Sequence, residues 1–165
     1  MIGISEVSSS EELALFNPAF LARLLRSAVA SHEKDAARGM SVSSAYLLLP
    51  LVLHKPTRDD LPAKSSSQMQ KWIREHPRHL ARLDGHVLGM RPFVSVAVRF
   101  GLQHGVLTTR EGALGAGALE RRSPLVAAAE TSEIADCLRV ASFLGRWFAR
   151  QPDAATLLAI WGLKP

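Results

Sequence analysis

The segment Tyr46–Leu53 (YLLLPLVL) is apolar on nearly every side and contains a proline. A helix with apolar residues all round is stable only when other elements cover it on most sides. A helix that begins at Ser41 or Ser43 and ends at Leu53 should therefore form the buried centre of the fold, with a kink or an early end at Pro50. The run is far shorter than the ~20 apolar residues that a membrane-spanning helix needs, so we expect no membrane segment here.

Amphipathic helices are predicted towards both ends of the chain. Asn17 is a good N-cap, and Pro18 suits the first position of the helix that follows. The apolar residues of that helix recur at the spacing of one helical face: Leu21, Leu24, Leu25 and Ala28. Near the other end, a long helix over 132–150 precedes a last helix that Asp153 caps and that ends near Trp161.

The middle of the chain is predicted to contain a connector and two further helices. Residues 55–67 include two prolines and several small polar residues, which are typical of a connector. Ser65–Ser67 can cap a short helix that Pro77 ends and whose apolar face contains Met69, Trp72 and Ile73. Pro92 opens another helix, and Gly105 suits its C-terminal cap. The apolar face of that helix consists of Phe93, Val96, Ala97 and Phe100.

One stretch has convincing β character, because Val106–Thr109 and Ala113–Leu119 can pair as two short strands across a tight turn. A helix, a glycine and a hairpin in this order are typical of the end of a winged-helix unit. The chain has 165 residues, which suits a single domain. We predict a mainly α fold with a small β-hairpin. A winged-helix-like core over 41–123 would have an N-terminal helix and loop over about 10–40 and a C-terminal helical segment over 124–165.

Residues that could carry chemistry are few, and their spacing matches no common kind of site. The single cysteine, Cys137, excludes a disulfide framework and a CxxC zinc site, and it suits a small core residue. The glycines after the hairpin turn are not followed by the Lys-Ser or Lys-Thr of a phosphate-binding loop. His54 and His104 each end an apolar helix, where a role as a C-terminal cap fits better than that of a general base. We therefore expect no catalytic residue, metal, cofactor or enzyme activity.

Basic residues outnumber acidic ones, with 20 Lys and Arg against 15 Asp and Glu, for a net charge of +5. This excess permits contact with nucleic acid or with an acidic partner. The candidate nucleic-acid contacts lie in one basic segment and around the hairpin: Lys64, Lys71, Arg74, Arg78, Arg110, Arg121 and Arg122. In a winged-helix fold these positions would be a recognition helix and a wing. Solvated helix faces have the same composition, so both interpretations stay open.

The helix over 132–150 has more apolar residues than one core face needs, because Val140, Phe143 and Trp147 form a second stripe. Either the helix is sandwiched within the fold, or the stripe is kept for another subunit, for which Trp and Arg are favoured anchors. A basic loop directly after the central helix is either a docking point or a plain turn. The candidate partner-binding residues are Lys55, Arg58, Val140, Phe143, Arg146, Trp147 and Trp161.

Several segments together resemble one bacterial protein family. They are FNPAF (16–20), LLPLVLHKPTR (48–58), WIREHP (72–77), GLQHGVL (101–107), GRWFA (145–149) and WGLKP (161–165). In this order and spacing they are similar to the middle component of three-component ABC systems. These are small proteins encoded beside an SMC- or Rad50-like ATPase and an effector. The resemblance extends from about residue 10 to the C-terminus, and the segment least like the pattern is GALGAGALE (112–120).

The resemblance implies a non-catalytic adaptor that links the ATPase to the effector in a bacterial, anti-phage defence complex of the Lamassu type. Contact with the DNA backbone and a homodimer of the isolated chain are compatible with this role. The N-terminal residues have no basic region followed by an apolar one, so we expect no secretion signal, no membrane association and a cytoplasmic location. The alternative is a stand-alone winged-helix DNA-binding transcriptional regulator.

Overall fold

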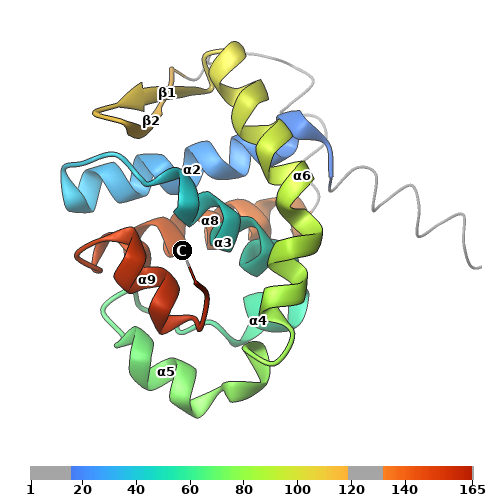
Figure 1. Ribbon diagram of the computed structural model, residues 1–165, viewed down its shortest axis with the longest axis vertical. Coiled ribbons are helices and arrows are strands. Elements are labelled where there is room, and N and C mark those ends of the chain that lie inside the picture. Colours follow the sequence, from blue (N-terminus) through green and yellow to red (C-terminus); the bar gives the residue numbers. More distant parts are fainter. Residues whose placement is uncertain (1–15, 119–131, 165) are drawn as a thin grey trace, which may run out of the picture.

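The computed structural model describes residues 16–118 and 132–164 of the chain. Its helices are α2 (Pro18–Ala36), α3 (Val42–Leu53), α4 (Lys55–Asp60), α5 (Met69–Glu75), α6 (Leu83–Gln103), α8 (Ser132–Ala149) and α9 (Ala154–Ile160). A 3₁₀ turn, η1 (Pro77–His79), follows α5, and strands β1 (Leu107–Arg110) and β2 (Ala113–Ala116) follow α6. The prediction of a mainly α fold with a small hairpin is confirmed (Figure 1).

Helix α3 is buried on most sides, as its apolar sequence predicts. Leu47, Leu48, Leu49 and Val52 have no exposed surface, and α2, α6, α8 and α9 all pack against the helix. Pro50 does not end it, because the helix continues to Leu53 and the amide of His54 donates to the carbonyl of Pro50. The predicted end of the helix at Leu53 is confirmed, and of the two effects considered for Pro50 the early end does not occur.

The segment after α3 is helical, where the sequence analysis expected a loop. Pro56 lies in the first turn of α4, where its fixed φ favours a helix start, and the amide of Arg58 donates to the carbonyl of His54. The connector is therefore confined to the residues between α4 and α5.

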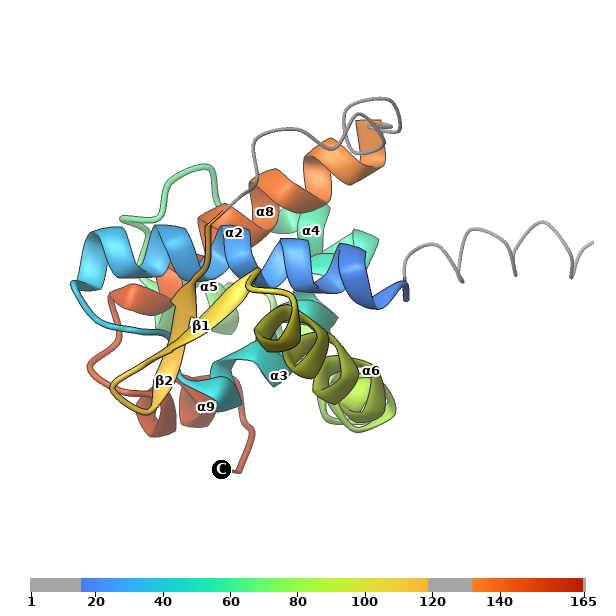
Figure 2. The same cartoon turned by 90° about the horizontal axis from the view of Figure 1, so that it is seen from above.

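The close contact between α2 and α8 holds the two ends of the described chain together. Gly145 of α8 lies against the backbone of α2, and a Cβ at this position would overlap the carbonyl of Ala28. Both apolar stripes of α8 are buried, including Val140, Phe143 and Trp147. Helix α8 is thus sandwiched within the fold. The helices predicted to flank the core on either side, α2 and α8, pack against each other and lie side by side in Figure 2.

Helix α6 differs from its prediction in both its start and its buried face. It begins at Leu83 rather than at Pro92, which lies on its exposed side in the middle of the helix. Phe93 and Val96, predicted to face the core, are 41% and 46% exposed. Ala97 is buried, as predicted, and the other buried residues of the helix are Leu83, Val94 and Gly101. Figure 2 shows α6 and α8 on opposite sides of α2.

The hairpin has the geometry that its turn residues predict. Arg110 pairs with Ala113, and the intervening Glu111 and Gly112 have φ values of 49° and 80°, as in a type I′ turn. Gly105 has a φ of 70° and follows the last turn of α6, as expected for a C-terminal cap. Met40 exchanges two backbone hydrogen bonds with Leu114 of β2, which ties the hairpin to the α2–α3 connection. The winged-helix part of the prediction is not confirmed.

We expect Gly145→Ala to lower the free energy of unfolding by about 1–3 kcal/mol, because a backbone carbonyl of α2 occupies the space that the new methyl group needs. The matched control is Gly89→Ala in α6, where an added Cβ has no neighbour within 4 Å. That variant should gain about 1 kcal/mol from helix propensity. Urea denaturation of both variants measures the difference. Equal stabilities would contradict the close α2–α8 contact.

Candidate functional site

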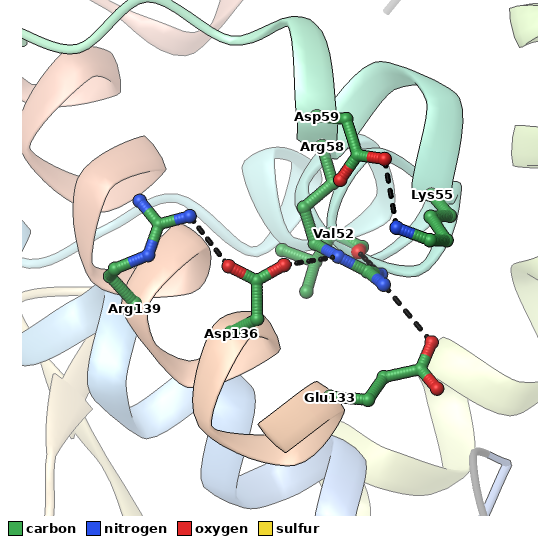
Figure 3. A network of polar contacts seen from close by, with 7 residues as sticks. All are labelled: Val52, Lys55, Arg58, Asp59, Glu133, Asp136 and Arg139. Atoms are coloured by element: carbon green, nitrogen blue, oxygen red, sulfur yellow. Dashed lines mark hydrogen bonds and ion pairs between the residues drawn. The ribbon is translucent and has the colours of Figure 1, made fainter.

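The guanidinium of Arg58 is buried where α3, α4 and α8 meet. Its side chain is 2% exposed, and its Nη1 donates to the carbonyl of Val52 over 2.7 Å. Nε donates to Asp136 over 2.9 Å and Nη2 to Glu133 over 3.0 Å (Figure 3). Arg139 also donates to Asp136, over 2.6 Å. The hydrogen bond from Arg139, followed by the contacts of Arg58, holds the pKa of Asp136 below its usual value.

Most of the candidate partner-binding residues are core residues in this structure. Val140, Phe143, Trp147 and Trp161 are each at most 5% exposed, and Arg58 is engaged with groups of its own chain. Two other candidates reach the surface. Lys55 is exposed and pairs with Asp59, and Arg146 is half-buried and donates to Ser142.

Three tryptophans form an aromatic cluster that fixes α5 on the rest of the fold. The ring of Trp72 lies 5.8 Å from that of Trp147 and 5.9 Å from that of Trp161, measured between centroids. Each indole N–H has a partner: Trp72 donates to the carbonyl of Asp60, Trp147 to that of Ser67 and Trp161 to the sulfur of Met69. Because all three indole N–H groups are hydrogen-bonded within the protein, a structural role fits these tryptophans.

A network of hydrogen-bonded polar side chains, which we name the Thr57 network, runs from the end of α3 to the 3₁₀ turn: His54, Thr57, His79 and Asp60. The Thr57 hydroxyl lies 2.8 Å from Nδ1 of His54 and 3.1 Å from Nδ1 of His79, whose Nε2 lies 2.8 Å from a carboxylate oxygen of Asp60. Arg78 binds the same carboxylate. Its hydrogen bond, followed by that of His79, lowers the pKa of Asp60. The Thr57 network was not predicted from the sequence, because no common motif has its spacing.

The order hydroxyl, imidazole, carboxylate is that of nucleophilic triads, but two features favour a structural role for the Thr57 network. Thr57 is 2% exposed, and its hydroxyl is held between two imidazoles. The adjoining cavity, lined in part by His54, Thr57 and His86, has a volume of about 120 Å³. Pockets for small molecules usually measure about 300–1,000 Å³.

The described candidate nucleic-acid residues lie in two separate parts of the fold. Lys64, Lys71, Arg74 and Arg78 are exposed on and around α5. Arg110 lies on the hairpin, where it pairs with Glu33 and donates to the carbonyl of Ala37. Figure 1 places α5 and the hairpin at opposite ends of the longest axis. The other two candidates, Arg121 and Arg122, lie outside the described residues.

The outward side of α6 carries large apolar side chains at the surface: Leu88 (59% exposed), Phe93 (41%), Val96 (46%) and Leu102 (39%). Beside Leu88, a groove of about 590 Å³ lies between α3, α6 and the end of the chain after α9. Its apolar lining consists of Tyr46, Leu47, Val87, Leu88, Leu158 and Leu163. We name these exposed side chains and the groove together the α6 surface.

The described residues hold no group of three or more His, Cys, Asp or Glu side chains that could bind a metal ion. Within the same residues, no helix is both long and apolar enough to cross a membrane.

The family model for the ABC-three component (ABC-3C) system Middle Component 3 matches residues 5–165, nearly the whole chain. The chain belongs to this family. The resemblance inferred from the sequence segments is therefore confirmed. No curated protein and no solved structure matches the chain.

Membership in the family makes this middle component part of a multi-component system, so a functional site of the protein can be a surface that binds another protein. The polar groups of the Arg58 network and the Thr57 network form their hydrogen bonds within the protein itself. On the α6 surface, in contrast, Leu88 and Val96 are largely exposed, while the ring of Phe93 packs against that of Phe16. Among the features described above, it has the composition that protein interfaces favour.

We expect Arg58→Met to lower the free energy of unfolding by about 3 kcal/mol, because it leaves the buried carbonyl of Val52 and one side of Asp136 without a donor. Lys55→Met on the same short helix removes only the exposed pair with Asp59 and should cause no measurable change. Chemical denaturation compares the two variants. Similar losses for both would contradict a structural role for the Arg58 network.

Two histidines should make the stability of this middle component depend on pH. His32 is 4% exposed and its Nδ1 donates to the carbonyl of Arg38, while His54 is half-buried. Burial is the main cause that lowers the pKa of each below 6.5. Below that pH the unfolded chain binds protons that the folded chain does not bind, so the free energy of unfolding falls as the pH falls. Denaturation between pH 7 and 5 should show this decline, with a smaller slope for His32→Asn; an unchanged slope would contradict it.

Proposed function

We propose that this middle component is a non-catalytic adaptor. It links an SMC- or Rad50-like ABC ATPase to an effector protein in a cytoplasmic, anti-phage defence complex. The family match over residues 5–165 is the observation that carries the proposal, because it makes the chain one part of a multi-component ABC system.

The distribution of polar and apolar groups supports an adaptor role over a catalytic one. The most triad-like group, around Thr57, is buried beside a cavity of about 120 Å³, which is small for a substrate site. Among the described residues, most of the large apolar side chains that are exposed lie on α6, as in a protein that binds another protein. An adaptor needs a rigid surface for its partners, and it needs no reacting group.

The alternative, a stand-alone DNA-binding regulator, draws support from the exposed Lys71 and Arg74 on α5. The basic residues of α5 and the hairpin are, however, far apart (Figure 1). Leu88 and Val96 of α6, the helix that directly precedes the hairpin, present apolar groups to the solvent, which phosphate contacts do not use.

Co-expression of this chain with the products of its neighbouring genes tests the adaptor proposal. A tag on the ATPase should recover this chain and the effector in a fixed ratio. When this chain is omitted, the ATPase should lose the effector, because the adaptor bridges the two. Recovery of the effector without this chain would overturn the proposal. A chain that purifies alone and shifts duplex DNA with steep salt dependence would favour the regulator instead.

A further inference from the structure

We propose that the α6 surface is the docking site for an acidic amphipathic helix of a partner protein in the complex. The inference rests on the proposed function and identifies the surface and the kind of partner element that it binds.

The first argument is how α6 divides its apolar residues. Val94, Ala97 and Gly101 face the chain's own core. On the outward side, Leu88, Pro92 and Val96 follow one another at one-turn intervals and form a single exposed stripe. The described chain offers nothing that covers Leu88 or Val96, which are 59% and 46% exposed. Two separate apolar faces on one helix indicate two neighbours, and the structure contains one of them.

The second argument is shape. The groove beside Leu88 has a volume of about 590 Å³, and α3 and Leu158 of α9 form its other walls. A groove between helices suits an amphipathic helix that inserts apolar side chains at successive turns. A bilayer surface is flat by comparison and cannot enter it. Gly85 and Gly89 lie beside the stripe, and an added Cβ at either would meet nothing within 4 Å, so another backbone has room to approach.

The third argument is charge. Arg91 and Arg99 of α6 are exposed, and neither forms an ion pair with another described residue. Arg91 and Lys164 line the groove, and Arg99 lies further along α6. The acidic residue at this groove is Asp84, which accepts a hydrogen bond from the amide of Gly85. Because the border is mainly basic, a helix with Asp and Glu beside its apolar face is complementary.

Charge also argues against a second copy of this chain as the occupant. Each copy has a net charge of +5, so two copies repel one another at long range. A partner with acidic residues gains from Arg91 and Arg99 instead.

The test uses the complex recovered through tagged ATPase or tagged effector. Leu88→Asp/Val96→Asp should reduce recovery of one of these partners by about tenfold or more, because acidic groups replace the apolar contacts. Its melting temperature should stay close to that of the parent, because both side chains are exposed. The matched control is Gln70→Asp/Thr109→Asp, which adds the same charge at exposed positions away from the α6 surface and should keep full recovery. Leu88→Ala/Val96→Ala gives a milder second variant in case the first does not fold.

A charge variant tests the acidic partner. Arg91→Glu/Arg99→Glu should weaken recovery of the same partner, and its remaining recovery should depend less on salt than that of the parent chain. Retention of both partners by all α6 variants would overturn the inference while the adaptor proposal stands. Failure of the parent chain to bind either partner would instead overturn the proposed function.

Other occupants give distinct results, each of which would overturn the inference. A parent chain that sediments as a dimer, and becomes a monomer on Leu88→Asp/Val96→Asp, would assign the surface to a second copy. Co-sedimentation with phosphatidylserine vesicles that the same variant abolishes would assign it to a lipid surface. A loss of duplex DNA binding in Arg91→Glu/Arg99→Glu, with partner recovery intact, would assign it to nucleic acid.

Discussion

Helix α3 is apolar on nearly all sides, and the rest of the fold is arranged to cover it. Helices α2, α6, α8 and α9 pack against it, and each contributes apolar residues to its cover. Helix α8 also packs against α2 and gives up both of its stripes, so that it has no apolar face left. Helix α6 covers α3 and α2 with one face and keeps Leu88 and Val96 at the surface. The outward apolar face of α6 thus takes no part in covering α3 and lies at the surface.

Capping signals in the sequence were reliable because each depends on a single residue's chemistry, whereas the helix end considered at Pro50 and the helix start expected at Pro92 did not occur. Asn17 and Asp153 cap their helices with side-chain oxygens, as predicted. Gly105 takes the positive φ that its position requires, and Gly112 takes one in the hairpin turn. These positions could be assigned without knowledge of the tertiary structure.

Which apolar stripes are buried could not be predicted in the same way. Helices α6 and α8 both have apolar residues at helical spacing, and periodicity does not say whether the chain itself or a partner covers them. Phe93 and Val96 were expected in the core but are exposed, whereas for Trp147 both a buried and a partner-binding position were left open and the structure shows the buried one. The Arg58 network was also hidden, since its partners Glu133 and Asp136 lie in a different part of the sequence.

The rigidity of α6 explains how an exposed apolar face can serve recognition. The helix is held along its inner side by α2 and α3 and at its end by β1, so its outward side chains are presented in a fixed arrangement. A partner that binds a preformed helix face does not have to order it, and more of the contact energy then remains as affinity. The buried polar groups also hold the elements in a fixed arrangement. Arg58 fixes α4 to α8, and the Thr57 network fixes η1 to α4. In this fold the polar interior holds the surface in shape, and the proposed docking site consists of the apolar stripe of α6 and the arginines beside it.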